Sequence, residues 1–339
     1  MEKAKESIES EQRRRDLPTN TENIAFKPEE MIECRKCARM NPPVRLKCFY
    51  CASELEISAE QAANLQTGLR KLEDWEKGYN LIYQPNSPGE TKFDTAEIAK
   101  ILRLEAEVLR KIVETKKTLP LVRVESKKEA EIIAGKLREK DLLTFIVSDE
   151  KLSPDILPTR LRSLEFDGDR LALVLFNTSE IREIRRDDLI LIVSGTVFER
   201  KTEAVEKRKK GESVILDASE TASDENLIDI YSRDLDANGY RITAKGFDFS
   251  SLEAEKGIVA RENMQKLIEK LREFAPDAKF DGDYSAIREV LGNVWEIENR
   301  KDSQGLKRHG FGKFDFSNIA TSSNLRQFTK YSRLQREIL

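Results

Sequence analysis

The four cysteines of this chain are the residues whose type and spacing most clearly indicate a chemistry. They form two Cys-x2-Cys pairs separated by ten residues, at Cys34, Cys37, Cys48 and Cys51. Two such pairs supply the four thiolates of a tetrahedral Zn²⁺ site, with Zn–S distances of about 2.3 Å. Four sulfur ligands leave no open coordination position, so the pattern predicts a structural Zn²⁺ rather than a catalytic one. The alternative is a pair of disulfides.

The context of the cysteines favours zinc over disulfides. The chain has no other cysteine, and its beginning, MEKAKESIESEQRRRD, lacks the apolar core of a secretory signal. Thiols of a protein without such a signal stay reduced. Positive neighbours would offset the net charge of about −2 of a zinc–thiolate centre, namely Arg35, Lys36, Arg39 and Lys47. We therefore expect a cytoplasmic protein that binds zinc.

The remaining residues give no catalytic constellation. His309 is the only histidine and follows Lys307 and Arg308 in a segment expected to be an exposed loop. No segment has the glycine spacing of a phosphate-binding loop. The pairs Asp167–Asp169 and Asp281–Asp283 lack the further ligands of a calcium loop and predict hairpin turns. The sequence thus predicts a protein that is not an enzyme.

Composition excludes further classes of protein. The 339 residues include 59 Lys and Arg and 62 Asp and Glu, so the net charge is only −3 although 36% of residues are charged. This balance argues against a nucleic-acid coat protein. The longest aliphatic run, 189–193, is far shorter than the roughly 20 residues of a membrane span. We expect no membrane span.

The cysteine region resembles the bacterial zinc-ribbon module over residues 31–55. Asn41 and Pro42 stand where that family has an Asn-Pro turn, and Leu55 stands where it closes the small core. Ala38 and Ala52 replace the glycines that usually follow each second cysteine. The spacing also resembles the Ran-binding-type zinc finger, which can bind single-stranded RNA or ubiquitin, but Ile32 stands in place of its tryptophan. The bacterial ribbon is the preferred resemblance.

The next segment predicts a small α/β module with the order β-α-α-β-α-β. Its helices begin at capping residues Asp94 and Ser126, and its apolar residues recur at helical spacing. Residues 79–149 resemble the C-terminal domain of the ribosomal stalk protein and the related ClpS adaptor fold in pattern, without their binding residues. A generic ferredoxin-like module is the plainer interpretation. A helix-turn-helix over 94–117 is disfavoured, because its second helix carries three glutamates.

From residue 158 onward the apolar period changes to two, which predicts strands. Six or seven antiparallel strands followed by a helix at 263–274 resemble a pleckstrin-homology-like barrel, a platform that binds peptides, proteins or lipid headgroups. The alternative is a domain that only presents the termini. Residues 201–225 are charged and aperiodic and are expected to form a long loop or a strand end with an insertion.

The tail 301–339 combines basic and aromatic residues. It has eight Lys and Arg against three Asp and Glu. Such a segment can dock on a protein or stack RNA bases, and protein contact is favoured. We expect the tail to be extended, and deletion of residues 313–339 should abolish partner recruitment while leaving the other modules folded. The candidate partner-binding residues are Lys307, Arg308, Phe311, Phe314, Phe316, Phe328, Lys330, Tyr331 and Arg333.

These patterns predict an α+β multidomain chain. The expected order is a disordered lead-in 1–30, a zinc ribbon 31–55, a linking helix 56–78, the α/β module 79–150, an antiparallel β-barrel-like domain with a C-terminal helix 158–275, and an extension 276–339. The leading functional hypothesis is a zinc-binding adaptor or scaffold that contacts other proteins. The alternative is an RNA- or ribosome-associated factor, with RNA preferred to DNA. The sequence identifies no small-molecule ligand.

Overall fold

The structure is a computed structural model, and it describes most of the chain. The described residues are 31–43, 45–57, 72–73, 76–85, 93–209, 212–233, 238–310 and 313–339, with only the backbone described for 204–209, 212–218, 303–310 and 313–318. The chain divides into two compact units, Met1–Gly68 and Leu69–Leu339. The expected lead-in 1–30 and most of the expected linking helix lie outside the described residues.

The described part of the first unit is a very small module. Its two strands, β1 (Ile32–Glu33) and β2 (Met40–Asn41), pair antiparallel. The buried core consists of only Ile32, Cys34, Cys48 and Leu55. Leu55 therefore closes the core as the sequence predicts. Such a core is too small to hold a fold by apolar burial alone, so the module depends on a further cross-link such as a metal.

The second unit begins with the predicted β-α-α-β-α-β order. The elements are β3 (Tyr79–Tyr83), α3 (Thr95–Leu102), α4 (Ala106–Glu114), β4 (Pro120–Val124), α5 (Lys127–Arg138), β5 (Thr144–Ser148) and a short α6 (Asp149–Leu152). The capping predictions are confirmed, because Asp94 accepts the N–H of Ala96 and Ser126 accepts the N–H of Glu129. The three strands form an antiparallel sheet in the order β4-β3-β5.

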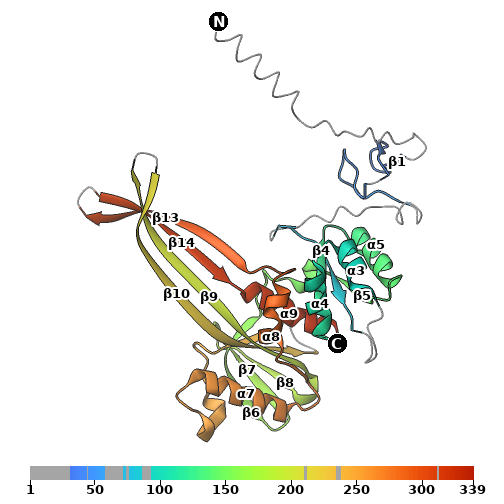
Figure 1. Cartoon of the computed structure of the whole chain (residues 1–339). Helices are drawn as coiled ribbons and strands as arrows, with labels where there is room; N and C mark the ends of the chain where they lie inside the picture. Colours follow the sequence, from blue (N-terminus) through green and yellow to red (C-terminus); the bar gives the residue numbers. More distant parts are fainter. Residues whose placement is uncertain are drawn as a thin grey trace. The chain divides into compact units, whose positions relative to one another are not determined.

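A large mixed sheet forms the rest of the unit (Figure 1). Its path runs β13-β14-β9-β10-β11-β6-β7-β8, and β12 pairs with β9 beside that path. The strands are β6 (Thr159–Asp167), β7 (Arg170–Leu175), β8 (Ile181–Arg185), β9 (Leu189–Lys209), β10 (Glu212–Ser232), β11 (Tyr240–Thr243), β12 (Lys279–Asp281), β13 (Glu298–Gly310) and β14 (Lys313–Ser323). The sheet stays open, so the expected barrel is wrong. The α+β class is confirmed.

One of the two predicted aspartate turns is a hairpin. Asp167 pairs with Arg170 across a two-residue loop, in which Gly168 has a φ of +57° that favours glycine. The second turn prediction is wrong. Asp281 ends β12, which runs parallel to β9, and the chain continues into α8 (Tyr284–Leu291) instead of returning as a strand.

The described residues of the segment 201–225, which are 201–209 and 212–225, form strands, so the long-loop expectation is wrong for them and they are strand ends instead. They continue β9 and β10, which pair antiparallel from Leu189 and Ser232 out to Lys209 and Glu212. β14 pairs with the outer part of β9, and β13 pairs with β14. We call the outer part of these four strands the arm, defined by residues 199–209, 212–223, 298–310 and 313–323. Figure 1 shows its strands running side by side beyond the helices.

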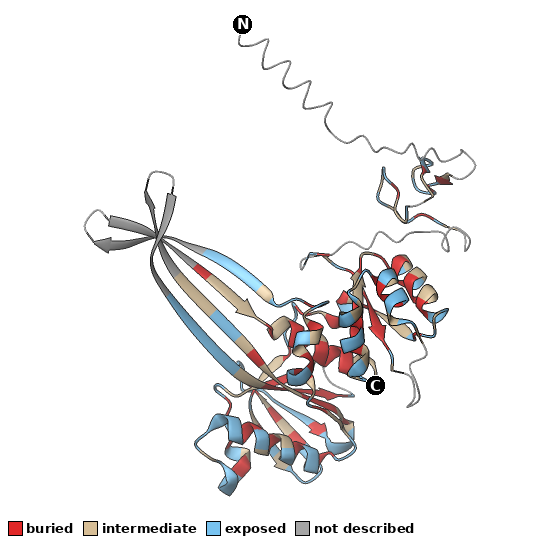
Figure 2. Ribbon diagram, in the orientation of Figure 1, coloured by how far each residue is buried: buried red, intermediate tan, exposed pale blue. Residues whose placement is uncertain are grey.

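The inner part of the sheet carries a core on each face. On β9, Leu191 and Val193 belong to one core and Ile192 to the other, because side chains alternate along a strand. The first core also contains the α/β module, α8 and α9 (Leu325–Glu337). The second contains α7 (Ala260–Phe274) and the short helix η3 (Ser250–Glu255). Figure 2 shows buried residues gathered in the helices and the inner strands.

Helix α9 connects the sheet with the α/β module. Phe328, Tyr331 and Leu334 on this helix are fully buried in the shared core. The Arg333 guanidinium donates a hydrogen bond of 3.0 Å to the carbonyl of Leu152. The expectation that the tail is extended is therefore wrong for residues 325–337, and their burial in the core argues against removal without unfolding.

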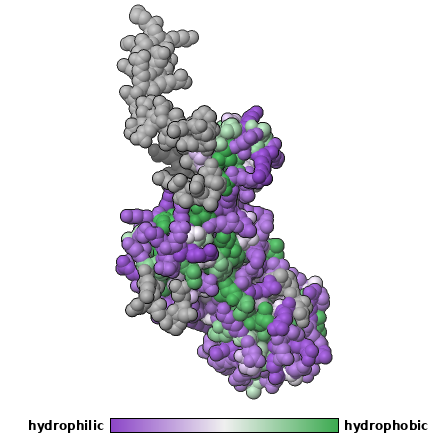
Figure 3. Space-filling view, turned by 90° about the vertical axis from the view of Figure 1, so that its right-hand side faces the viewer, coloured by the Kyte–Doolittle hydropathy of each residue, from purple (hydrophilic) through white to green (hydrophobic). Residues whose placement is uncertain are grey.

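Hydrophilic side chains predominate among the coloured residues on the side shown in Figure 3, where hydrophobic side chains form a band between them. The chain has 36% charged residues. Among the described residues, no helix has both the length and the apolar character needed to cross a bilayer.

Candidate metal centre

Two similar turns carry the four cysteines. In the first turn the N–H of Ala38 donates to the carbonyl of Cys34, and in the second the N–H of Ala52 donates to the carbonyl of Cys48. In each turn the first cysteine also donates its own N–H to a carbonyl five residues later, at 3.0 and 2.8 Å. The second turn therefore has the same hydrogen bonds as the first turn, fourteen residues later in the chain. Both turns direct their thiols to one point.

The four sulfur atoms are placed to hold a metal ion. All of them lie within 4.8 Å of one another. The Sγ atoms of Cys34 and Cys51 are 3.5 Å apart, and those of Cys37 and Cys48 are 3.6 Å apart. A tetrahedral ZnS₄ site has S–S edges of about 3.8 Å, which follows from its Zn–S bonds. A disulfide requires about 2.05 Å, so the geometry matches a metal site and not the disulfide alternative.

Hydrogen bonds favour the ionised form of two of the thiols. The Ser53 hydroxyl lies 3.1 Å from the Cys34 sulfur, and this hydrogen bond together with main-chain N–H groups lowers the pKa of Cys34 to about 6. Burial raises the pKa of Cys48, but two main-chain N–H groups and a buried side-chain amide outweigh it, so the net shift of that pKa is downward. Ionised thiols are the form that binds a metal.

Cys37 behaves oppositely. The N–H of Arg39 lowers the pKa of Cys37, but burial and the neighbouring thiols together raise it more, to about 12. Three sulfur neighbours without a cation disfavour a further negative charge. A divalent metal would supply the missing positive charge, so its binding would favour release of the Cys37 proton.

Asn41 joins the two turns from within the module. It is fully buried, and its amide donates to the Arg39 carbonyl at 2.8 Å and to the Cys48 sulfur at 3.5 Å. Its carbonyl accepts the N–H of Phe49 at 2.8 Å. The Asn-Pro turn noted in the sequence thus also fixes the second cysteine turn.

The surface of the module presents three large side chains that sequence analysis did not single out. Phe49 is 68% exposed, Tyr50 53% and Met40 45%. Arg39 lies over the Tyr50 ring at 4.6 Å and Arg45 over the Phe49 ring at 5.1 Å. We call these five residues the aromatic patch. The core of this module has only four buried residues, so two aromatic rings beside the cysteines had to lie on the surface. The shortness of the module was therefore the signal in the sequence that could have revealed the patch.

The tail residues proposed as a partner site do not form one surface. Phe328, Tyr331 and Arg333 are at most 3% exposed, because they belong to the core around α9. Lys330 is partly buried, with its ammonium 6.0 Å from the Trp295 ring.

The other candidate residues lie elsewhere. Four of them belong to the arm strands, where only the backbone is described, namely Lys307, Arg308, Phe314 and Phe316. Phe311 lies outside the described residues. The sequence could not separate these groups, because a buried helix face and an arm strand both appear as alternating basic and aromatic residues.

Comparison with protein-family models, with curated proteins and with solved structures finds no match to this chain. The chemistry of the cysteine cluster and its surroundings is therefore the basis for assigning a function.

Proposed function

We propose that the chain is a non-enzymatic adaptor or scaffold whose zinc-ribbon module binds one structural Zn²⁺ and contacts other proteins. The observation that carries the proposal is the closed four-thiol cluster beside the exposed aromatic patch. Four thiolates fill a tetrahedral shell and leave no position for a substrate. The cysteines are free thiols, which fits a cytoplasmic protein.

The composition of the aromatic patch supports protein contact. Aromatic residues, Met and Arg are the residue types enriched in the centres of protein interfaces. Residues 31–57 carry five Lys and Arg against three Glu, and a zinc–tetrathiolate core adds about two negative charges. The metal-loaded module is thus close to neutral. Phosphate binding depends on a surplus of positive charge, so neutrality favours a protein partner over RNA.

One observation favours RNA as the alternative partner. Arg39 and Arg45 stand over the rings of Tyr50 and Phe49. Stacked aromatic and guanidinium groups can also hold unpaired bases. The experiment therefore has to separate the two kinds of partner.

The test is affinity purification from the native cell with three forms of the full chain. These are the wild type, the double variant Phe49→Ala/Tyr50→Ala, and the control Ile258→Ala. Ile258 is an exposed apolar residue of the second unit, so the control removes apolar surface outside the patch. Zinc content is measured for each form, because the patch side chains are not metal ligands and one equivalent per chain is expected in all three.

We expect a defined set of proteins with the wild type and the control, reduced at least about tenfold with the double variant, since interface aromatics often contribute 2 kcal/mol or more. Nuclease treatment and physiological salt should leave this set unchanged. Capture that nuclease abolishes would favour the RNA alternative, and identical protein sets for all three forms would contradict the proposal.

A further inference from the structure

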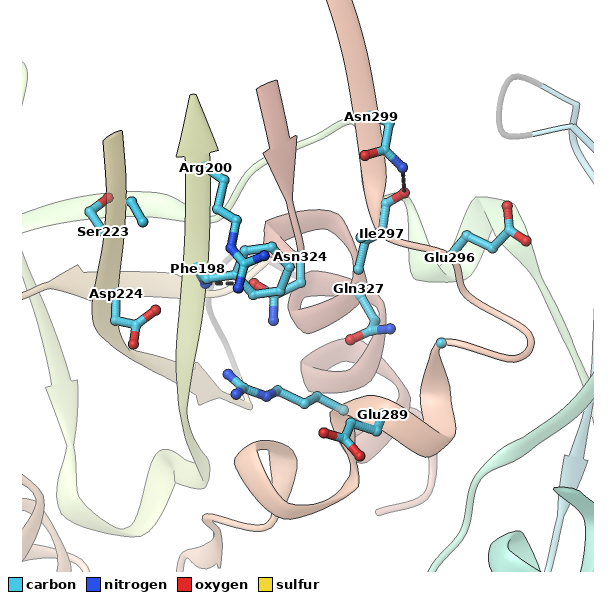
Figure 4. Close-up of a pocket in the computed structure, with 13 residues that line it drawn as sticks. Phe198, Arg200, Ser223, Asp224, Glu289, Glu296, Ile297, Asn299, Asn324 and Gln327 are labelled. Carbon is cyan, nitrogen blue, oxygen red and sulfur yellow. Dashed lines mark hydrogen bonds between the residues drawn. The ribbon is translucent and has the colours of Figure 1, made fainter. Parts of the chain in front are cut away.

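A pocket of about 840 Å³ lies at the base of the arm, and we call it the arm-base pocket. It is bounded by β9, β10, α8 with the segment that follows it, and the beginning of α9 (Figure 4). Its volume falls within the usual range of about 300–1,000 Å³ for small-molecule sites. All the residues that line it have described side chains.

The pocket contains a buried hydrogen-bond donor without an acceptor. Asn324 is 1% exposed, and its Oδ1 accepts the N–H of Phe198 at 2.7 Å. Its Nδ2 is buried and has no hydrogen-bond partner. The amide cannot be turned around, because its NH₂ group would then face another N–H. Figure 4 shows the nitrogen directed into the pocket. A buried polar group of this kind favours a ligand that supplies an acceptor.

Positive charge surrounds this donor. Asn324 precedes the first residue of α9, whose N-terminal end carries a partial positive charge. Arg200 and Arg288 also line the pocket, and among the described residues neither guanidinium forms a salt bridge. In Figure 4 the Arg200 side chain extends from its strand toward Asn324. The walls of one pocket thus carry three kinds of donor that suit an anionic group.

Carboxylates on the same walls limit the ligand further. Asp224 and Glu289 are exposed and line the pocket on the β10 and α8 sides. They disfavour a doubly charged phosphate, since like charges at short range repel. They also offer acceptors for a cationic group of the ligand. Phe198 supplies an apolar wall between these polar groups.

We propose that the arm-base pocket binds a small zwitterion of the amino-acid or dipeptide class. Its carboxylate accepts the Asn324 Nδ2–H and pairs with Arg288, while its ammonium group faces Asp224 or Glu289. This site is separate from the cysteine cluster and from the adaptor proposal, so either can fail without the other.

The test uses the full zinc-loaded chain and follows the side-chain NH₂ signal of Asn324 by NMR. The probes are pools of the twenty L-amino acids and of alanyl dipeptides at millimolar concentration, then single members of a positive pool. Each positive compound is repeated with its carboxylate amidated and with its amine acetylated. We expect a shift of the Asn324 signal with the parent compound and a loss of binding for both blocked forms.

Variants complete the test. Asn324→Asp retains the oxygen that accepts the Phe198 N–H but replaces the free donor with a negative oxygen, so binding should weaken roughly 100-fold. Arg288→Gln should weaken it at least about tenfold. The control Asn293→Asp makes the same exchange on an exposed residue outside the pocket and should leave binding unchanged. The proposal would be overturned if no pool shifted the Asn324 signal or if a compound with a blocked carboxylate or amine still bound. Unchanged affinity of the Asn324→Asp variant would also overturn it.

Discussion

Two alanines beside the metal-ligand candidates stand at positions where the backbone conformation favours glycine. Ala38 has a φ of +55° and Ala52 a φ of +57°, which is the left-handed region that favours glycine. Each follows the second cysteine of its pair. From the sequence alone, these positions are only departures from the glycines of the zinc-ribbon family. The backbone angles now give the departure a physical cost in both turns.

We expect Ala38→Gly and Ala52→Gly each to stabilise the metal-loaded module by about 1 kcal/mol, because glycine adopts a positive φ without steric strain. The measurement is zinc retention against a competing chelator, which should require more chelator for each variant. The control is Ala286→Gly on an exposed part of α8, where glycine should instead lower the stability of the second unit by about 1 kcal/mol. Easier loss of zinc from either ribbon variant would contradict this account.

At the scale of elements, the helices were predictable because each buries one face. In α5, four apolar residues recur at helical spacing and are buried, namely Ala130, Ile133, Ala134 and Leu137. In α7, the face predicted from helical spacing has Met264, Leu267 and Leu271 buried and Ile268 half-buried. The outer strands of the arm gave no such signal, because the described side chains there are mostly exposed and belong to neither core. Main-chain pairing holds these strands, and it leaves no apolar pattern in the sequence.

The arm should therefore be removable without loss of the fold. The test deletes the residues between Lys201 and Thr221 and those between Lys301 and Ala320, and replaces each deleted part with an Asn-Gly turn. The residues that each turn joins are paired in the sheet, so the strand register is kept. We expect the free energy of unfolding to change by no more than about 1 kcal/mol, because both cores remain complete. Thermal and denaturant unfolding followed by circular dichroism provides the measurement.

A chain that ends at Asn324 is the contrasting control for the arm deletion. It retains the arm but loses Phe328, Tyr331 and Leu334 from the shared core. It should not fold, since each large core side chain contributes several kcal/mol. If the chain that ends at Asn324 unfolds cooperatively, or if the arm deletion does not, the roles assigned to α9 and to the arm are wrong.

At the scale of the whole molecule, the two units depend on different sources of stability. The second has two extensive apolar cores and the buried ion pair of Asp229 with Arg241, whose guanidinium makes bonds of 2.6 and 2.7 Å to the carboxylate. The first has four buried core residues, two of which are cysteines. If the proposed metal binds there, its binding energy would be the larger part of the folding energy of the described module of the first unit.

Removal of the metal should unfold only the described module of the first unit. EDTA, or the substitution Cys48→Ser, is expected to collapse the NMR signals of residues 31–57. The thermal midpoint of the second unit should stay within about 2 °C, because the four cysteines that could hold a metal all lie in the first unit. EDTA saturated beforehand with zinc is the control and should change neither. The prediction would be contradicted if elemental analysis detected no metal in a chelator-free preparation. A lowered thermal midpoint of the second unit would also contradict it.

The sequence by itself determined the features that local chemistry controls. Cysteine spacing, helix caps and one-sided apolar patterns depend on neighbours a few residues apart, so the thiol cluster and the α/β module could be predicted. Only the tertiary structure decided where distant segments meet. It placed the tail helix in the core, extended an aperiodic charged segment into paired strands, and brought Asn324, Arg288 and Arg200 to one pocket. The pairing of β14 with β9 and the hydrogen bond between Phe198 and Asn324 join residues over a hundred positions apart, which no local pattern encodes.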